Sequence, residues 1–237
     1  MEIMEIIQDA AMYPINNIKA LVIYAVLTII AALALVFTGV GFIGASQTSG
    51  AASGGLGILG IIGIIIAFAI LLLIAGYMLD VIKIAIMRED GSPEIDPKRQ
   101  IINGLKIIVL AFIYMIIPIV LMNILAAINE YLLIVGIILL IVFAVLLLVA
   151  QCRFAKTESL GDALNFGAVI NDIKKIGIVK VIAVVIIISV IAYILSFIGT
   201  GIGQFSEIIG SILTAIFSIY TAFLQNRAYG LLYSDAE

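Results

Sequence analysis

The sequence predicts an all-α polytopic membrane protein, with six transmembrane helices arranged as three hairpins. Three observations predict this class. First, the chain is 65% hydrophobic and only 11% charged, whereas a soluble domain is closer to half apolar and a quarter charged. Second, six apolar runs follow one another, each near the length of about 20 residues that crosses a bilayer as a helix. Third, all twelve Lys and Arg residues belong to one side of the membrane that these runs define.

The six apolar runs place the spans along the chain. We expect them at Ile18–Phe42, Gly57–Asp80, Leu105–Leu125, Tyr131–Ala150, Ile178–Ile198 and Glu207–Arg227. The runs are too long and too uniformly apolar for strands of a membrane barrel, which alternate between two faces. The first residues are acidic, so an uncleaved first span is favoured over a signal peptide. We therefore expect one membrane domain over residues 1–237, with hairpin units at about 1–87, 88–156 and 157–237.

The cations orient the spans. They lie at the start of the first span, between spans two and three, between four and five, and at the end of the sixth. The other three loops contain no Lys or Arg. Cytoplasmic loops carry an excess of these residues, so the distribution predicts a multi-pass protein of the cell membrane with both termini in the cytoplasm.

Two cytoplasmic segments differ in character. Residues 87–100 are charged and contain Pro93 and Pro97, which exclude a continuous helix. Between residues 159 and 176, apolar residues recur at helical spacing, and Ser159 with Asp162 resembles a capping box. We expect an amphipathic helix in the inner interface there, and similar spacing in the segment before the first span predicts a second one.

One pattern, Ile-Asn-x-(Ile/Leu)-Lys, occurs three times, each at the cytoplasmic entrance of an odd-numbered span. It places Asn16 and Lys19, Asn103 and Lys106, and Asn171 and Lys174 at these entrances. An Asn at a helix start can accept from free backbone N–H groups, and a Lys there can raise its amine to lipid phosphates. We expect anchoring and capping. The three units are then either copies of a repeat around a pseudo-threefold axis along the membrane normal, or a coincidence of residues that interfaces favour.

Twelve positions within about residues 70–180 form a recognisable set: Gly76, Tyr77, Pro93, Glu94, Gly104, Lys106, Tyr114, Pro118, Arg153, Leu160, Ala163 and Phe166. With these positions the chain resembles an uncharacterised prokaryotic membrane family, common in archaea, known as domain of unknown function 4013. The chain departs from the family at Ile95, where an aromatic residue is common. The resemblance implies a membrane fold and brings no activity or ligand.

Polar residues also mark the three points where the chain returns to the cytoplasm. These are Asp80 and Lys83, Gln151 and Arg153, and Gln225 and Arg227. We interpret them as ordinary interfacial residues, and a polar ring around the proposed axis is the alternative. For Asp80, an ion pair with nearby Lys83 or an interface anchor is favoured over a proton relay. In the third span, Pro118 removes a backbone hydrogen bond to Tyr114 and predicts a kink.

The composition gives little support to catalysis. The chain has no His and a single Cys, Cys152, so common bases and metal ligands are missing. We expect no enzyme, no cofactor and no metal site. The first hypothesis is a non-catalytic protein that organises the membrane or belongs to an envelope complex. The alternative is a transporter or channel for a small molecule or a lipid, with a path between the hairpins and the last span as its polar wall. The expected partner is the lipid bilayer, with a second copy or another membrane protein beside it, and no nucleic acid.

Overall fold

The computed structural model describes residues 1–236, and the described chain is helical almost throughout, without strands. Six of its helices are long and apolar enough to cross a membrane, which confirms the all-α, multi-pass class. The helices are α1 Ile3–Asn16, α2 Ile18–Gln47, α3 Ala51–Ile86, α4 Pro97–Ile128, α5 Leu133–Thr157, α6 Leu160–Ala163, α7 Phe166–Ile176, α8 Ile178–Gly203 and α9 Glu207–Tyr233, with single 3₁₀ turns at Glu130–Leu132 and Ser234–Ala236.

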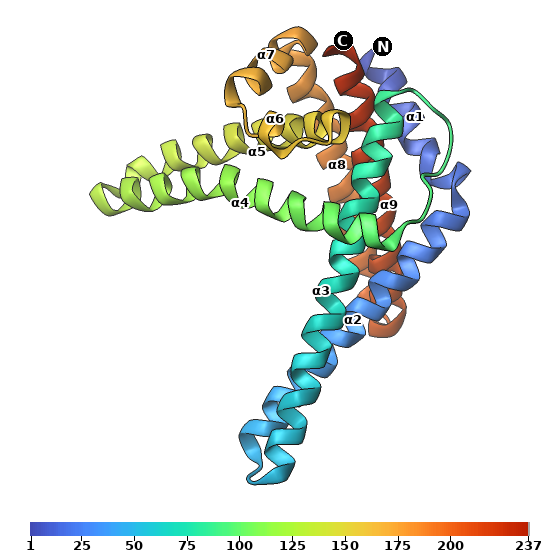
Figure 1. The fold of residues 1–237 in the computed structure, drawn as a ribbon, viewed down its shortest axis with the longest axis vertical. Helices are drawn as coiled ribbons and strands as arrows, with labels where there is room; N and C mark the ends of the chain where they lie inside the picture. The colour runs from blue at the N-terminus through green and yellow to red at the C-terminus, as the bar shows by residue number, and fades with distance from the viewer. Residues whose placement is uncertain (237) are drawn as a thin grey trace.

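The long helices lie side by side in the pairs α2–α3, α4–α5 and α8–α9 (Figure 1). The α2–α3 pair runs to the far tip of the molecule, whereas the α4–α5 pair projects sideways from it. Both chain termini lie together at the opposite end, with α1, α6 and α7. We call this the polar end, because the ion pairs of the described residues lie on segments that meet there. That the three pairs are copies of one repeat stays a prediction.

Local signals explain where the short segments begin and end. The carboxylate of Asp96 accepts a hydrogen bond from the N–H of Arg99 at 3.1 Å, and Pro97 occupies the first turn of α4. Gly177, with φ of +95°, separates α7 from α8, a backbone conformation that residues with a side chain rarely adopt. Residues 97–100 form the first turn of α4 itself.

The region expected to form one helix over residues 159–176 forms two. The Ser159 hydroxyl accepts from the N–H of Asp162 at 3.2 Å and starts α6, which ends after one turn. The Asn165 side chain then accepts from the N–H of Ala168 at 3.1 Å and starts α7. A side chain that caps a new helix competes with the continuing one, and this explains the break.

Two clusters of buried apolar side chains hold the polar end together. The larger one joins α1 and every helix from α3 to α9. The smaller one is aromatic: the rings of Tyr24 and Tyr77 stack at 4.2 Å between centroids, and Phe223 lies edge-on to Tyr24. Away from this end the spans expose large apolar side chains over most of their length, as expected for helices whose solvent is lipid.

Candidate functional site

Three ion pairs join the long helices to the segments that start the next span. Asp80 of α3 accepts from Arg99 of α4 at 2.7 Å. Arg153 of α5 donates to Asp172 of α7 at 2.8 Å. Arg227 of α9 donates to Asp9 of α1 at 2.7 Å.

These three pairs close a cycle. In each, the end of one helix pair is bound to the segment that leads into the following pair, and the last returns to the N-terminal helix. The sequence separation is 19 residues in both Asp80–Arg99 and Arg153–Asp172. In two of the pairs the end of the long helix supplies the arginine, Arg153 or Arg227. At the end of α3 it supplies the carboxylate, Asp80. Each of these ion pairs therefore links two consecutive parts of the chain at the polar end, and we call each one a joint.

The Asp80 joint contains a buried hydrogen-bond network. Gln100, fully buried, donates from Nε2 to the second carboxylate oxygen of Asp80 at 3.0 Å and to the carbonyl of Glu94 at 3.1 Å. The hydroxyl of Tyr24 donates to Gln100 Oε1 at 3.4 Å. A buried carboxylate is tolerated when its oxygens are hydrogen-bonded to partners of this kind, so the network fixes α2, α3 and α4 relative to one another.

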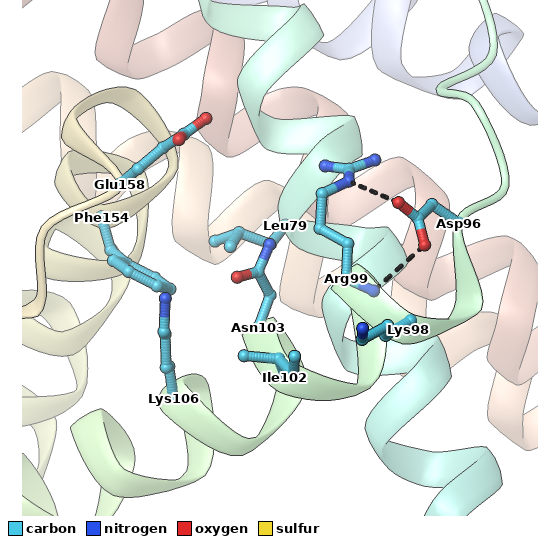
Figure 2. Close-up of a pocket in the computed structure, with 9 residues that line it drawn as sticks. All are labelled: Leu79, Asp96, Lys98, Arg99, Ile102, Asn103, Lys106, Phe154 and Glu158. Carbon is cyan, nitrogen blue, oxygen red and sulfur yellow. Dashed lines mark hydrogen bonds and ion pairs between the residues drawn. The ribbon is translucent and has the colours of Figure 1, made fainter.

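Beside this joint lies a cleft of about 400 Å³ between the start of α4 and the ends of α3 and α5 (Figure 2). We call it the cationic pocket. Its lining residues are Leu79, Asp96, Lys98, Arg99, Ile102, Asn103, Lys106, Phe154 and Glu158. Three cations and one amide therefore share a small space with three apolar side chains and two carboxylates.

The carboxylates of the pocket are engaged by other groups. Asp96 caps α4 and lies 3.7 Å from Nε of Arg99, which also binds Asp80. Glu158 pairs with Lys83 of α3. The hydrogen bond from Lys83 lowers the pKa of Glu158 below its usual value, so this carboxylate stays charged at neutral pH.

The two lysines of the pocket differ from its third cation, Arg99. Among residues 1–236, neither Lys98 nor Lys106 has a carboxylate within ion-pair distance, and the Lys106 amine lies 5.8 Å from the centre of the Phe154 ring. The amide of Asn103, one turn from Lys106, faces the same space. Two ammonium groups and an amide N–H next to apolar walls are the kind of donors that an anion at a membrane interface would need.

The structure separates the three Asn-Lys patterns. Asn103 and Lys106 line the cationic pocket. Lys174 borders a second, apolar groove, and Asn171 is exposed on α7. Asn16 is the last residue of α1, and Lys19 is exposed in the first turn of α2.

The capping role expected for the three asparagines is wrong. Asn103 and Asn171 lie inside α4 and α7, where backbone N–H groups already have helical partners. The caps are Asp96 and Asn165 instead. Near Asn16, its neighbour Asn17 donates from Nδ2 to the carbonyl of Tyr13 at 2.9 Å, at the end of α1.

The six polar residues at the cytoplasmic returns have different environments. Asp80, Arg153 and Arg227 form the cycle of ion pairs, and Gln151 and Gln225 are half-buried on α5 and α9. The expected Asp80–Lys83 pair is absent from the ion pairs of residues 1–236, because Asp80 binds Arg99 and Gln100 and Lys83 binds Glu158. Pro118 is buried within a continuous α4, and its kink stays a prediction.

Sequence reasoning missed several partners, chiefly Asp9, Arg99, Gln100, Glu158 and Asp172. The repeated separation of 19 residues between opposite charges was the available signal for two of them. No group of three or more Cys, His, Asp or Glu residues placed to hold a metal ion occurs within the described chain.

The family described as "Protein of unknown function (DUF4013)" matches residues 60–204, more than half of the chain. The chain belongs to this family. No curated protein and no solved structure matches it.

Several of the residues that suggested the DUF4013 family meet at one place in the fold. The hydroxyl of Tyr114 donates to the carbonyl of Ala163 at 2.8 Å, and its ring packs on Phe166 at 4.5 Å between centroids. Arg153 donates to the carbonyl of Asp162 as well as to Asp172. The resemblance therefore rests partly on side chains that fix α6 and α7 against α4 and α5.

Proposed function

We propose that this chain is a non-catalytic membrane-organising protein that binds a phosphate-bearing anion, the headgroup of a membrane lipid, in the cationic pocket. The observation that carries the proposal is the pair of lysines, Lys98 and Lys106, without carboxylate partners among the described residues. Phosphate oxygens accept from ammonium and amide N–H donors, so Asn103 supplies a third donor.

The apolar residues of the pocket support a lipid rather than a free anion. Leu79, Ile102 and Phe154 line the same cleft, and about half of the Ile102 side chain is exposed. A lipid presents a phosphate and hydrocarbon together, whereas inorganic phosphate would leave these side chains in water.

The cell-membrane location and the cytoplasmic position of the termini belong to the same proposal. Every Lys and Arg lies at the polar end or in the segments that lead to it, and cations favour the cytoplasmic leaflet, which is negatively charged. The pocket would then face the anionic headgroups of that leaflet.

The proposal is tested by lipid retention. We expect purified protein to retain phosphatidylglycerol over phosphatidylcholine in native mass spectrometry. Lys106→Gln should lower this retention about fivefold, since one Lys near an anionic surface contributes about 1 kcal/mol. Lys19→Gln is the matched control, because Lys19 occupies the same motif position but lies outside the pocket. Equal losses in the two variants would count against the proposal.

Free inorganic phosphate distinguishes the two sources of the anion. If the pocket holds a lipid headgroup, millimolar phosphate should leave the retained phosphatidylglycerol unchanged. Displacement of the lipid by phosphate, with Lys106→Gln lowering phosphate binding as well, would indicate a soluble anion as the ligand.

A transport function is the second candidate, supported by one observation. Thr214, Ser218 and Thr221 of α9 line a 250 Å³ pocket with Ser196 of α8, and α9 is the least apolar of the six spans. Tyr220, on the same helix, is not among the lining residues and donates to the carbonyl of Ala11 at 2.8 Å. Solute uptake by liposomes that contain the protein, reduced by Ser218→Leu, would favour transport over membrane organisation.

A further inference from the structure

Another cavity lies between α5 and α8. It is about 880 Å³ in volume, in the range of about 300–1,000 Å³ that holds small molecules. Val142, Val145 and Leu146 of α5 form one wall, and Ile182, Val185 and Ile186 of α8 form the other. Ile170, Ile173 and Lys174 of α7 cover its polar end. We call it the α5–α8 groove.

The groove exists because two long helices diverge. The α4–α5 pair projects away from the α8–α9 pair (Figure 1), and α7 lies between α5 and α8 at the polar end. The Arg153–Asp172 ion pair and the hydroxyl of Tyr233, which donates to Asp172 at 2.7 Å, hold α7 in this position. At the comparable junction of α3 and α4 the helices touch, since Gly76 and Gly104 bring their backbones together.

The charge distribution of the groove is one-sided. Lys174 is its only charged lining residue, and no carboxylate of the described chain lies within ion-pair distance of its amine. Its neighbour Lys175 differs, because it donates to the carbonyl of Ala236 at 3.3 Å. The groove thus carries one free positive charge at the polar end and apolar side chains below it.

The long dimension of the groove follows the spans. The lining residues of α8 extend from Ile178 to Ile186, a distance of about 12 Å at the rise of an α-helix. A ligand lying there would keep a polar group beside Lys174 and an apolar part directed into the hydrophobic layer. This is the chemistry of an anionic lipid, and the bilayer supplies such molecules at the open side of the groove.

We propose that the α5–α8 groove binds a hydrocarbon chain of an anionic lipid whose headgroup lies against Lys174. The site is separate from the cationic pocket, which lies at the junction of α3, α4 and α5 and shares no lining residue with the groove. The inference does not depend on the proposed function of that pocket.

The experiment uses full-length protein in bilayers that contain phosphatidylglycerol with a photoactivatable group on its acyl chain. We expect illumination to label peptides of α5 and α8. Val185→Phe should remove most of this label, because the larger ring fills the groove. Val190→Phe is the matched control, since Val190 lies on the same helix, is 51% exposed and does not line the groove. Unchanged labelling in Val185→Phe would overturn the proposal.

A second comparison tests the contribution of the lipid headgroup, with a substitution at Lys174 rather than in the apolar walls of the groove. Lys174→Gln should lower labelling by the phosphatidylglycerol probe about fivefold, whereas Lys175→Gln should leave it unchanged. The same probe built on phosphatidylcholine should label the two variants equally.

Lys106→Gln should not change the α5–α8 label, so failure at the pocket and failure at the groove are separate results. If Val185→Phe instead abolishes cross-links between two chains and leaves the lipid label intact, a second copy occupies the groove and the proposal is wrong.

Discussion

At the residue scale, Arg227 is the most constrained charge of the described chain. Its side chain is only 1% exposed. It donates to both carboxylate oxygens of Asp9 and to the carbonyl of Glu89 at 2.6 Å, and it lies 4.8 Å from the centre of the Tyr13 ring. A buried guanidinium is tolerable only with such partners. Burial also raises the pKa of Tyr13, so its phenol stays neutral and donates to the carbonyl of Gly91.

Removal of this guanidinium should be costly. We expect Arg227→Ala to lower the free energy of unfolding by about 3 kcal/mol, since it breaks a buried pair and leaves Asp9 uncompensated. Arg88→Ala is the control, because that side chain is 53% exposed and a surface pair contributes at most about 1 kcal/mol. Thermal unfolding in detergent measures both. Equal shifts in Tm would show that the Arg227 joint is not a major stabilising contact.

At the element scale, the crossing of α3 and α4 depends on two glycines. A Cβ on Gly76 would collide with the carbonyl of Gln100, and a Cβ on Gly104 with the carbonyl of Leu72. The two backbones can approach this closely only without side chains. The crossing places Gln100 and Arg99 against Asp80 and sets the mouth of the cationic pocket. The glycines therefore act on the site through helix packing.

Two glycine-to-alanine substitutions on α3 distinguish the effect of packing against α4 from the effect of helix propensity. We expect Gly76→Ala to destabilise the protein and to lower phosphatidylglycerol retention, because α4 must move away from α3. Gly54→Ala lies on the same helix, where no neighbouring atom is within 4 Å, and should be neutral or stabilise by up to about 1 kcal/mol. Measured Tm values that fall equally in both variants would exclude the packing explanation.

At the scale of the whole molecule, the N- and C-termini are tied together. The N-terminal amine donates to Asp235 at 3.1 Å, and Arg88 and Lys180 bind the same carboxylate. With the Arg227–Asp9 pair, these contacts close the polar end while the far tips of the helix pairs stay apart (Figure 1). The ion pairs that join the helix pairs therefore gather at one end of the molecule.

The orientation of this end can be measured by cysteine labelling. The native Cys152 is fully buried and faces the carbonyl of Tyr229. We therefore expect it to react little with a thiol reagent, so that labelling reports on the introduced cysteines. We expect Ser49→Cys, at the far tip, to react with an impermeant thiol reagent in intact cells. Ile95→Cys, in the exposed loop at the polar end, should react only after the membrane is opened. The reverse pattern would place the termini outside.

The sequence by itself determined the class of the protein. Apolar runs of bilayer length can satisfy their backbone only as helices in lipid, so the six spans and the family followed from residues that are neighbours in the chain. The helix caps and the break at Asn165 depend on hydrogen bonds between residues close in the chain. The prediction that the asparagines of the repeated pattern are caps was nevertheless wrong.

Only the tertiary structure decided which charges meet. Asp80 lies three residues from Lys83 in the chain, yet it binds Arg99, because the α3–α4 crossing at Gly76 and Gly104 brings the start of α4 onto it. The same holds for the three Asn-Lys patterns, which look equivalent in sequence but lie beside different cavities or none. Pairing and cavity shape depend on how distant helices pack, and in a chain with apolar side chains on every face of its spans, periodicity carries no information about that packing.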